Sequence, residues 1–175
     1  MQIERIEEMR LTHADDAKIG TLLDLCFDDD FSERSFYQQR HNTRLIVRSG
    51  DAVIGHMAIS LRAIRVGERL CHAAGLAEVA THPDHRGQGI ASRLLDAAIA
   101  EARASVADFF MLFGVAPLYA ANGFRNQPNT ITCVDMRGVR TGDLRQRKNE
   151  GVMVMELGNL AWDPTAPIDL VGFPF

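Results

Sequence analysis

Apolar positions recur at helical spacing near the start of the chain. Between Asp15 and Phe27 the apolar residues follow the i, i+3, i+4, i+7 spacing of an amphipathic helix. The charged segment 3–11 that precedes it alternates imperfectly, and it predicts a first strand. Beyond the acidic run 28–30, residues 32–37 have the pattern of a short, capped second helix.

Strand patterns dominate the middle of the chain. Residues 45–47 and 52–66 flank a turn and predict a hairpin. A second turn leads into a strand over 70–81, in which the mid-strand Gly75 indicates a bulge or the close approach of another group. The later segments predict a loop at 83–89, a helix at 90–105, a buried strand at 109–115, a short helix at 117–121 ended by Asn122–Gly123, strands at 130–136 and 152–157, and a basic linker at 137–148.

Length and composition describe an ordinary globular chain. Its 175 residues predict one domain, 1–175, and the 46% of hydrophobic residues are enough for a core. The 19 Lys and Arg against 23 Asp and Glu give a formal charge of -4, which argues against nucleic acid as a partner. An anionic ligand would therefore need a local site.

The cysteines and the first residues indicate the cellular setting. Cys26, Cys71 and Cys133 show no CxxC spacing, so we expect reduced thiols rather than disulfides or a zinc site. The first residues are charged and no apolar run is long enough to cross a bilayer, so we expect neither a signal peptide nor a membrane partner. Together these features predict a cytoplasmic protein.

Segment 81–91, Thr-His-Pro-Asp-His-Arg-Gly-Gln-Gly-Ile-Ala, lies between a predicted strand and a predicted helix. A glycine-containing loop that opens a helix presents backbone N–H groups and the positive end of the helix dipole to an anion. Gly87 and Gly89 let the backbone approach closely, and Arg86 adds a positive charge. The segment therefore predicts a phosphate site. The alternative is a structural glycine turn; neither a Walker loop nor a Rossmann turn is present.

Two motifs in this order resemble one family. Arg86, Gly89 and Ala91 match the pyrophosphate loop Arg/Gln-x-x-Gly-x-Gly/Ala of the GNAT acyltransferases, and residues 118–124 match that family's Leu-Tyr-x-x-x-Gly-Phe. The chain resembles the GNAT N-acetyltransferase superfamily most clearly over 52–124. A fainter likeness is to aminoglycoside 2'-N-acetyltransferases and nodulation N-acyltransferases.

The resemblance implies an α/β (α+β) fold with a mixed, mostly antiparallel central sheet flanked by helices. It implies acetyl-CoA as cofactor, with the pantetheine arm paired to one strand and the phosphates on the loop. The acceptor amine would attack the thioester directly, and a backbone N–H near Val79 would stabilise the oxyanion. The cofactor-binding residues implied in this way are Val79, Ala80, Thr81, Arg86, Gly87, Gln88, Gly89, Ile90, Ala91 and Ser92.

The reaction needs two proton transfers, because an alkyl ammonium must lose a proton and the departing thiolate must gain one. The resemblance implies that Tyr119 is the acid; the alternative is a ring that only packs on the sheet. Glu78 is the candidate base if a bulge changes the strand's parity or if water relays the proton. His72 is a second candidate, and a purely structural role is open for both.

Two further groups suggest other chemistry. His82 and His85 flank a proline with no third ligand near them in sequence, so we expect no metal. The acidic run Asp28–Asp30 is either a solvated surface or an electrostatic attractant for a cationic acceptor.

These observations predict an N-acetyltransferase that transfers the acetyl group of acetyl-CoA to a small, cationic amine; a homodimer is left open. One alternative is an N-acyltransferase that uses a longer acyl-CoA or an acyl carrier protein. The other is a non-catalytic CoA-binding sensor domain. A docking patch for a carrier protein would be formed by Arg137, Arg140, Arg145, Arg147 and Lys148.

Overall fold

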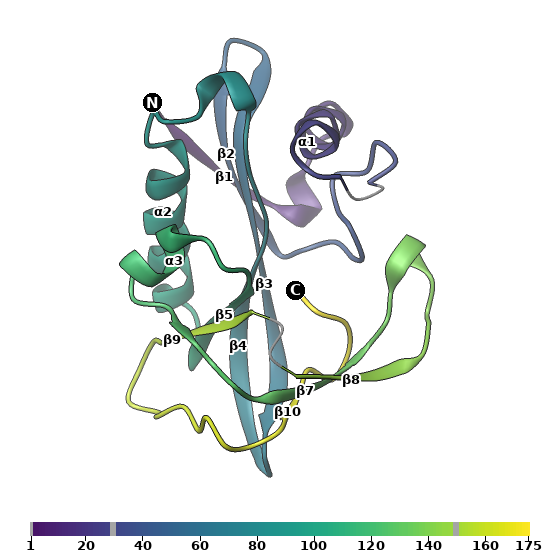
Figure 1. Cartoon of the computed structure of the whole chain (residues 1–175). Helices are drawn as coiled ribbons and strands as arrows, with labels where there is room; N and C mark the ends of the chain where they lie inside the picture. The colour runs from purple at the N-terminus through teal and green to yellow at the C-terminus, as the bar shows by residue number, and fades with distance from the viewer. Residues whose placement is uncertain (1, 29–30, 149–150) are drawn as a thin grey trace. The chain divides into compact units, whose positions relative to one another are not determined.

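The computed structural model describes residues 2–28, 31–148 and 151–175 (Figure 1). Its elements in chain order are β1 (Ile3–Glu7), η1 (Glu8–Arg10), α1 (His13–Cys26), β2 (Thr43–Ser49), β3 (Ala52–Val66), β4 (Arg69–Thr81), η2 (Pro83–His85), α2 (Ile90–Ala104), β5 (Phe109–Phe113), α3 (Pro117–Ala121), β6 (Arg125–Asn126), β7 (Thr130–Val134), η3 (Arg137–Val139), β8 (Leu144–Lys148), β9 (Val152–Glu156) and β10 (Ile168–Asp169). None of the described helices has the length and apolar character needed to cross a membrane.

The chain forms two compact units. The first contains Met1–Ile59 and Ala77–Ala98, and the second contains Ser60–Leu76 and Ile99–Phe175. Strands β3 and β4 and helix α2 contribute to both units, because the boundaries fall inside these elements.

In the first unit, β2 pairs antiparallel with β1 and with the start of β3. Helix α1 begins at a Thr12 cap, whose side chain accepts a hydrogen bond from the Asp15 N–H. The helix buries Ile19, Leu22 and Leu23 in a cluster with residues of β2, β3 and β4. Removing these side chains from water stabilises the position of α1.

The second unit contains the strand order β6-β9-β5-β4-β3-β10-β7-β8. Strands β4 and β5 are parallel, as are β7 and β10, whereas β5–β9 and β7–β8 are antiparallel. The predicted mixed, mostly antiparallel sheet with helices is confirmed.

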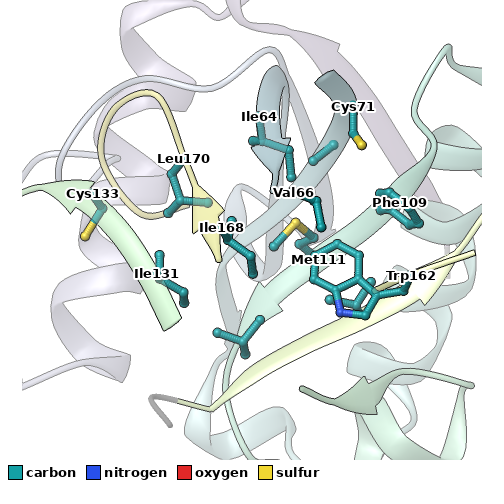
Figure 2. Packing of buried hydrophobic residues seen from close by; sticks show 13 residues of the cluster. Ile64, Val66, Cys71, Phe109, Met111, Ile131, Cys133, Trp162, Ile168 and Leu170 are labelled. Carbon is teal, nitrogen blue, oxygen red and sulfur yellow. The ribbon is translucent and has the colours of Figure 1, made fainter. Parts of the chain in front are cut away.

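The core of the second unit lies around Phe109 and Trp162 (Figure 2). Their rings meet edge to face, with centroids 4.9 Å apart, and the Trp162 indole N–H donates to Asn129 Oδ1. Cys71 and Cys133 are buried in the same cluster on different strands. Among the described residues, no disulfide includes Cys26, Cys71 or Cys133.

The helix predicted over 32–37 is wrong. Ser32 and Glu33 have φ angles of +49° and +63°, which a right-handed helix excludes. Other parts of the first unit also bind the backbone of this segment: Arg44 donates to Ser35 O, and the Tyr37 N–H donates to Glu78 Oε1. Side chains distant in sequence thus take up backbone groups that a helix would pair internally.

The basic linker predicted at 137–148 is wrong in part. Residues 144–148 form β8 and pair with β7, with Leu144 opposite Val134. The two-residue strands β6 and β10 have no signal in the sequence, because such short strands depend on the neighbours they pair with.

Candidate cofactor and active site

The predicted phosphate loop connects β4 to α2. Gly87 and Gly89 have φ angles of +75° and +76°, a conformation that favours glycine. Apart from each glycine's chain neighbours, no atom of the described residues lies within 4 Å of where a Cβ would be at either position. Helix α2 begins at Ile90, and the N–H groups of its first turn have no partner within the helix. The loop therefore presents an open backbone surface suited to an anion.

The start of the loop is fixed by a short 3-10 helix. The His82 N–H donates to Ile54 O at 2.9 Å, and His82 Nδ1 accepts from the Asp84 N–H at 3.2 Å. The rings of His82 and His85 meet edge to face, with centroids 5.5 Å apart. Within the described ranges, no three His, Cys, Asp or Glu side chains come together as a metal site. Both histidines thus shape the turn before the glycines.

The start of α2 is held against β3 at a glycine. A Cβ on Gly55 would lie 2.5 Å from Ile90 Cγ2 and 3.0 Å from a Leu94 methyl group. Ile90 and Leu94 are buried, whereas Arg86, Gln88, Gly89 and Ser92 are exposed. The absence of a side chain at Gly55 therefore lets the helix pack its apolar face against β3 while the polar residues of the loop stay in solvent.

The irregularity of β4 is at Glu78. This residue has a φ of +52°, which is rare for a residue with a side chain, in an otherwise extended strand. Gly75 was the position expected to bulge or to be approached closely. It is approached by the ring of Phe175, which lies 1.8 Å from the place of a Cβ. The backbone irregularity of β4 is thus at Glu78, whereas the close approach of another residue is at Gly75.

The Glu78 carboxylate belongs to a buried polar network. Arg44 Nη1 lies 3.1 Å from Oε2, His41 Nε2 lies 3.0 Å from Oε1, and the Tyr37 N–H donates to Oε1 at 2.8 Å. Burial by itself raises the pKa of Glu78, but His41 and Arg44 outweigh it and lower the pKa below its ordinary value. Glu78 is therefore ionised at neutral pH.

Arg44 and His56 complete this network. The Arg44 side chain is fully buried, and it also binds both carboxylate oxygens of Glu8 at 2.7 and 3.0 Å. His56 is fully buried, and its pKa is lowered to about 3. Burial is the larger cause, and the positive charge of Arg44 is the next. Its Nε2 lies 3.2 Å from Arg44 Nη1 and its Nδ1 lies 2.8 Å from Glu78 O. Since Arg44 can only donate and a carbonyl can only accept, His56 is neutral with its proton on Nδ1.

Tyr119 lies on α3, after β5. Its half-buried ring meets Phe124 edge to face at 6.2 Å, and a Cβ on Gly114 would lie 3.1 Å from Tyr119 Cε2. Burial raises the pKa of Tyr119, so the phenol keeps its proton at neutral pH. Gly123, with a φ of +93°, ends this segment as the sequence predicts.

The remaining candidate groups are His72, the acidic run and the basic patch. His72 is half exposed and lies 3.6 Å from Asp108. Asp28 is exposed, while Asp29 and Asp30 lie outside the described residues. Within the expected carrier-protein patch, Arg137 and Arg145 pair with Asp135 at 3.1 and 2.7 Å. The carboxylate of Asp135 thus reduces the net positive charge of the patch.

Sequence reasoning missed His41, Arg44 and His56. The one signal was the presence of Arg44 and His56 inside strand segments that are otherwise apolar. Each alone is compatible with a solvent-facing position, and only the fold brings them to Glu78.

Solved structures with this fold include acetyltransferases crystallised with cofactor. A GNAT family acetyltransferase from Brucella melitensis in complex with acetyl-CoA is 17% identical, with a TM-score of 0.61, over 95% of this chain and 94% of that chain. The GNAT family N-acetyltransferase YhbS from Escherichia coli in complex with CoA is 20% identical, with a TM-score of 0.62, over 97% and 88%. Escherichia coli ElaA is 11% identical, with a TM-score of 0.59, over 89% and 100%. No curated protein matches the sequence.

The fold is that of the GNAT acetyltransferases. The family model described as an acetyltransferase (GNAT) domain matches residues 9–126, which include α1, the glycine loop and Tyr119. The chain belongs to the GNAT acetyltransferase family.

Proposed function

We propose that this protein is an acetyl-CoA-dependent N-acetyltransferase that acts on a small amine. The observation that carries the proposal is the open loop with Gly87 and Gly89 in left-handed conformations directly before α2. Family membership and the acetyl-CoA and CoA in the Brucella melitensis and Escherichia coli structures support the choice of cofactor. The whole chain, residues 1–175, is proposed to act as one acetyltransferase domain.

The loop and the strand before it are proposed to bind acetyl-CoA in complementary ways. Arg86 and the backbone of Gly87–Ser92 bind the phosphates, because free N–H groups at a helix start and a guanidinium both favour anions. Val79–Thr81 pair with the pantetheine arm through backbone hydrogen bonds. A backbone N–H near Val79 stabilises the oxyanion that forms when the amine attacks the thioester.

Tyr119 is proposed to donate the proton that the leaving thiolate requires. Its raised pKa supports this role, since the phenol is protonated before transfer. Glu78 is proposed as the base, acting through water or through His41. The left-handed backbone at Glu78 supports this role, because it interrupts the extended conformation of β4, and the carboxylate is ionised, as a base must be.

The acceptor is proposed to be a cationic amine. The exposed Asp28, with its two acidic neighbours in the sequence, supports electrostatic attraction of an ammonium group. A cytoplasmic location is supported by the three cysteines, none of which is in a disulfide among the described residues.

The deciding experiment measures CoA release from acetyl-CoA with a panel of small amines. We expect amine-dependent release of free CoA thiol and a product heavier than the acceptor by one acetyl group. A sensor domain would bind CoA in calorimetry without turnover on any amine. A preference for longer acyl-CoA or acylated carrier protein over acetyl-CoA would support the acyltransferase alternative and overturn acetyl transfer.

A further inference from the structure

His56, in the first unit, is a polar residue in the most buried stretch of β3. Residues 53–60 of this strand are buried, and His56 is 0% exposed. A buried imidazole destabilises a fold unless its ring nitrogens have partners. Here Nδ1 lies 2.8 Å from Glu78 O, and Nε2 lies 3.2 Å from Arg44 Nη1. The neutral ring thus donates to the Glu78 carbonyl and accepts from Arg44.

The carbonyl that His56 binds belongs to the irregular residue of β4. Glu78 has a φ of +52°, a left-handed conformation that costs free energy in a residue with a side chain. Such a conformation persists only where the surrounding contacts hold it. Glu78 is held on both sides of its Cα, because Arg44 Nη1 lies 3.1 Å from the carboxylate and His56 binds the carbonyl.

The contact with His56 differs in kind from the other contacts of Glu78. His41 Nε2 and the Tyr37 N–H bind the Glu78 carboxylate, at 3.0 and 2.8 Å from Oε1. These two groups restrain the end of a side chain that can rotate about its own bonds. The hydrogen bond from His56 acts on the main chain, so it restrains the peptide unit itself.

The direction of the Glu78 carbonyl sets the direction of the next N–H. The Glu78 carbonyl and the Val79 N–H belong to one planar peptide unit, and none of the described peptide bonds is cis. In a trans unit the C=O and N–H bonds point in opposite directions. While His56 holds the carbonyl, the Val79 N–H therefore points away from the buried imidazole. Rotation of this unit would leave the buried Nδ1–H without its acceptor.

We infer that His56 is a positioning residue that holds the Glu78–Val79 peptide unit so that the Val79 N–H points at the thioester carbonyl of acetyl-CoA. This inference rests on the proposed function, in which a backbone N–H near Val79 stabilises the oxyanion. A fixed donor polarises the carbonyl before attack and stabilises the negative charge that forms afterwards. His56 acts through the backbone of β4 and transfers no proton.

Infrared difference spectroscopy tests this hydrogen bond without any acceptor amine. The probe is acetyl-CoA labelled with carbon-13 at the acetyl carbonyl. A hydrogen bond lowers the carbonyl stretching frequency, so the label bound to the wild-type protein should absorb at a lower frequency than the free label. His56→Leu removes the donor to Glu78 O and should lose most of this shift. His56→Asn should keep it, because the amide Nδ2 can replace the imidazole Nδ1 as donor.

His56→Gln keeps the test decisive if the Leu variant does not fold. The glutamine amide lies at the place of the imidazole Nε2, beside Arg44, so the Glu78 carbonyl loses its donor and the shift should fall. Ile46→Ala is the matched control. Ile46 lies opposite His56 in the β2–β3 pairing and is also 0% exposed, but it offers no polar group to Glu78. This variant should lose stability through a cavity and keep the wild-type shift.

The kinetic test uses an amine that the wild-type protein acetylates. His56→Leu should lower kcat by about 10², the cost of one lost oxyanion donor, and change the KM for acetyl-CoA by less than about threefold. His56→Asn should recover most of kcat. A role limited to stability would instead lower the melting temperature and leave kcat of the folded fraction unchanged.

The outcomes separate this inference from the proposed function. A shift and a kcat that survive in His56→Leu, no shift in the wild-type complex, or an equal loss of shift in Ile46→Ala overturns the inference alone. A His56-dependent shift without acetylation of any amine overturns the proposed function and leaves the positioning role standing. A wild-type protein that does not bind acetyl-CoA overturns both.

Discussion

Arg44 Nη1 and Glu78 Oε2 lie 3.1 Å apart, and their side chains are 0% and 6% exposed. Both side chains are buried away from water, so each charge is compensated by the other. Glu8 supplies a second carboxylate to the same guanidinium. This pair connects β2 to the irregular position of β4. It holds the candidate base ionised and in one place.

Removing Arg44 should destabilise the protein strongly. Arg44→Met leaves the carboxylates of Glu78 and Glu8 buried without the guanidinium that both contact, so we expect the free energy of unfolding to fall by about 3–5 kcal/mol. Urea denaturation followed by circular dichroism measures the change. Arg5→Met is the control, because the Arg5–Glu7 pair is exposed and should contribute less than about 1 kcal/mol. Equal losses in the two variants would contradict a structural role for the buried pair.

Neutral His56 makes stability depend on pH. Its pKa is about 3 in the folded protein, against about 6.5 in the unfolded chain, so between these values the unfolded chain binds the extra proton. Stability should therefore rise with pH across this window, by up to about 1.4 kcal/mol per pH unit from this site. Denaturation at pH 5 and pH 6 should show a smaller slope in His56→Gln than in wild type. His13→Gln, at the exposed start of α1, should keep more of the slope.

Gly89→Glu should weaken CoA binding. The substitution places a side chain and a negative charge where the phosphates are proposed to bind, so we expect at least a hundredfold loss of affinity in calorimetry. Gly50→Glu is the matched control, because Gly50 also has a positive φ, +58°, and open surroundings in a hairpin turn. An unchanged CoA affinity in a folded Gly89→Glu protein would remove the loop from the cofactor site.

Tyr119→Phe tests the proposed acid. We expect kcat to fall by about 10² to 10⁴ with little change in CoA affinity, because only the proton donor is lost. The ring is retained, so the melting temperature should barely move. Tyr37→Phe, at the chain's other tyrosine, should keep its activity. Wild-type turnover in Tyr119→Phe, with chemistry rate-limiting, would leave solvent as the proton donor.

Gly75→Ala should displace Phe175. The new methyl group would lie 1.8 Å from the Phe175 ring, so we expect a loss of stability of about 1–3 kcal/mol. Phe175→Ala should remove most of that penalty in the double variant, which thermal denaturation of all four proteins can measure as a coupling. Gly158→Ala is the control, because no described residue other than its chain neighbours has an atom within 4 Å of its Cβ position. Additive effects of Gly75→Ala and Phe175→Ala would show that the ring does not occupy this place.

The sequence alone determined the elements that local patterns specify. Apolar periodicity predicted α1 and α2, alternation and turn residues predicted the β2–β3 hairpin, and the two glycines predicted the loop before α2. These features depend on residues close in the chain, since side-chain spacing and allowed φ angles are local properties. The loop and Tyr119 could be found from the sequence for the same reason, because the family's motifs are short stretches of the chain.

Only the tertiary structure decided the polar network around Glu78 and the contacts of Arg62 with Phe173 and Phe175. Arg44, His56 and Glu78 come from three strands, and Arg62 meets residues more than a hundred positions later in the chain. The helix predicted at 32–37 was wrong because Arg44 and Glu78, distant in sequence, take its backbone groups. Burial and ion pairing depend on which strands become neighbours, and one-dimensional spacing does not encode that choice.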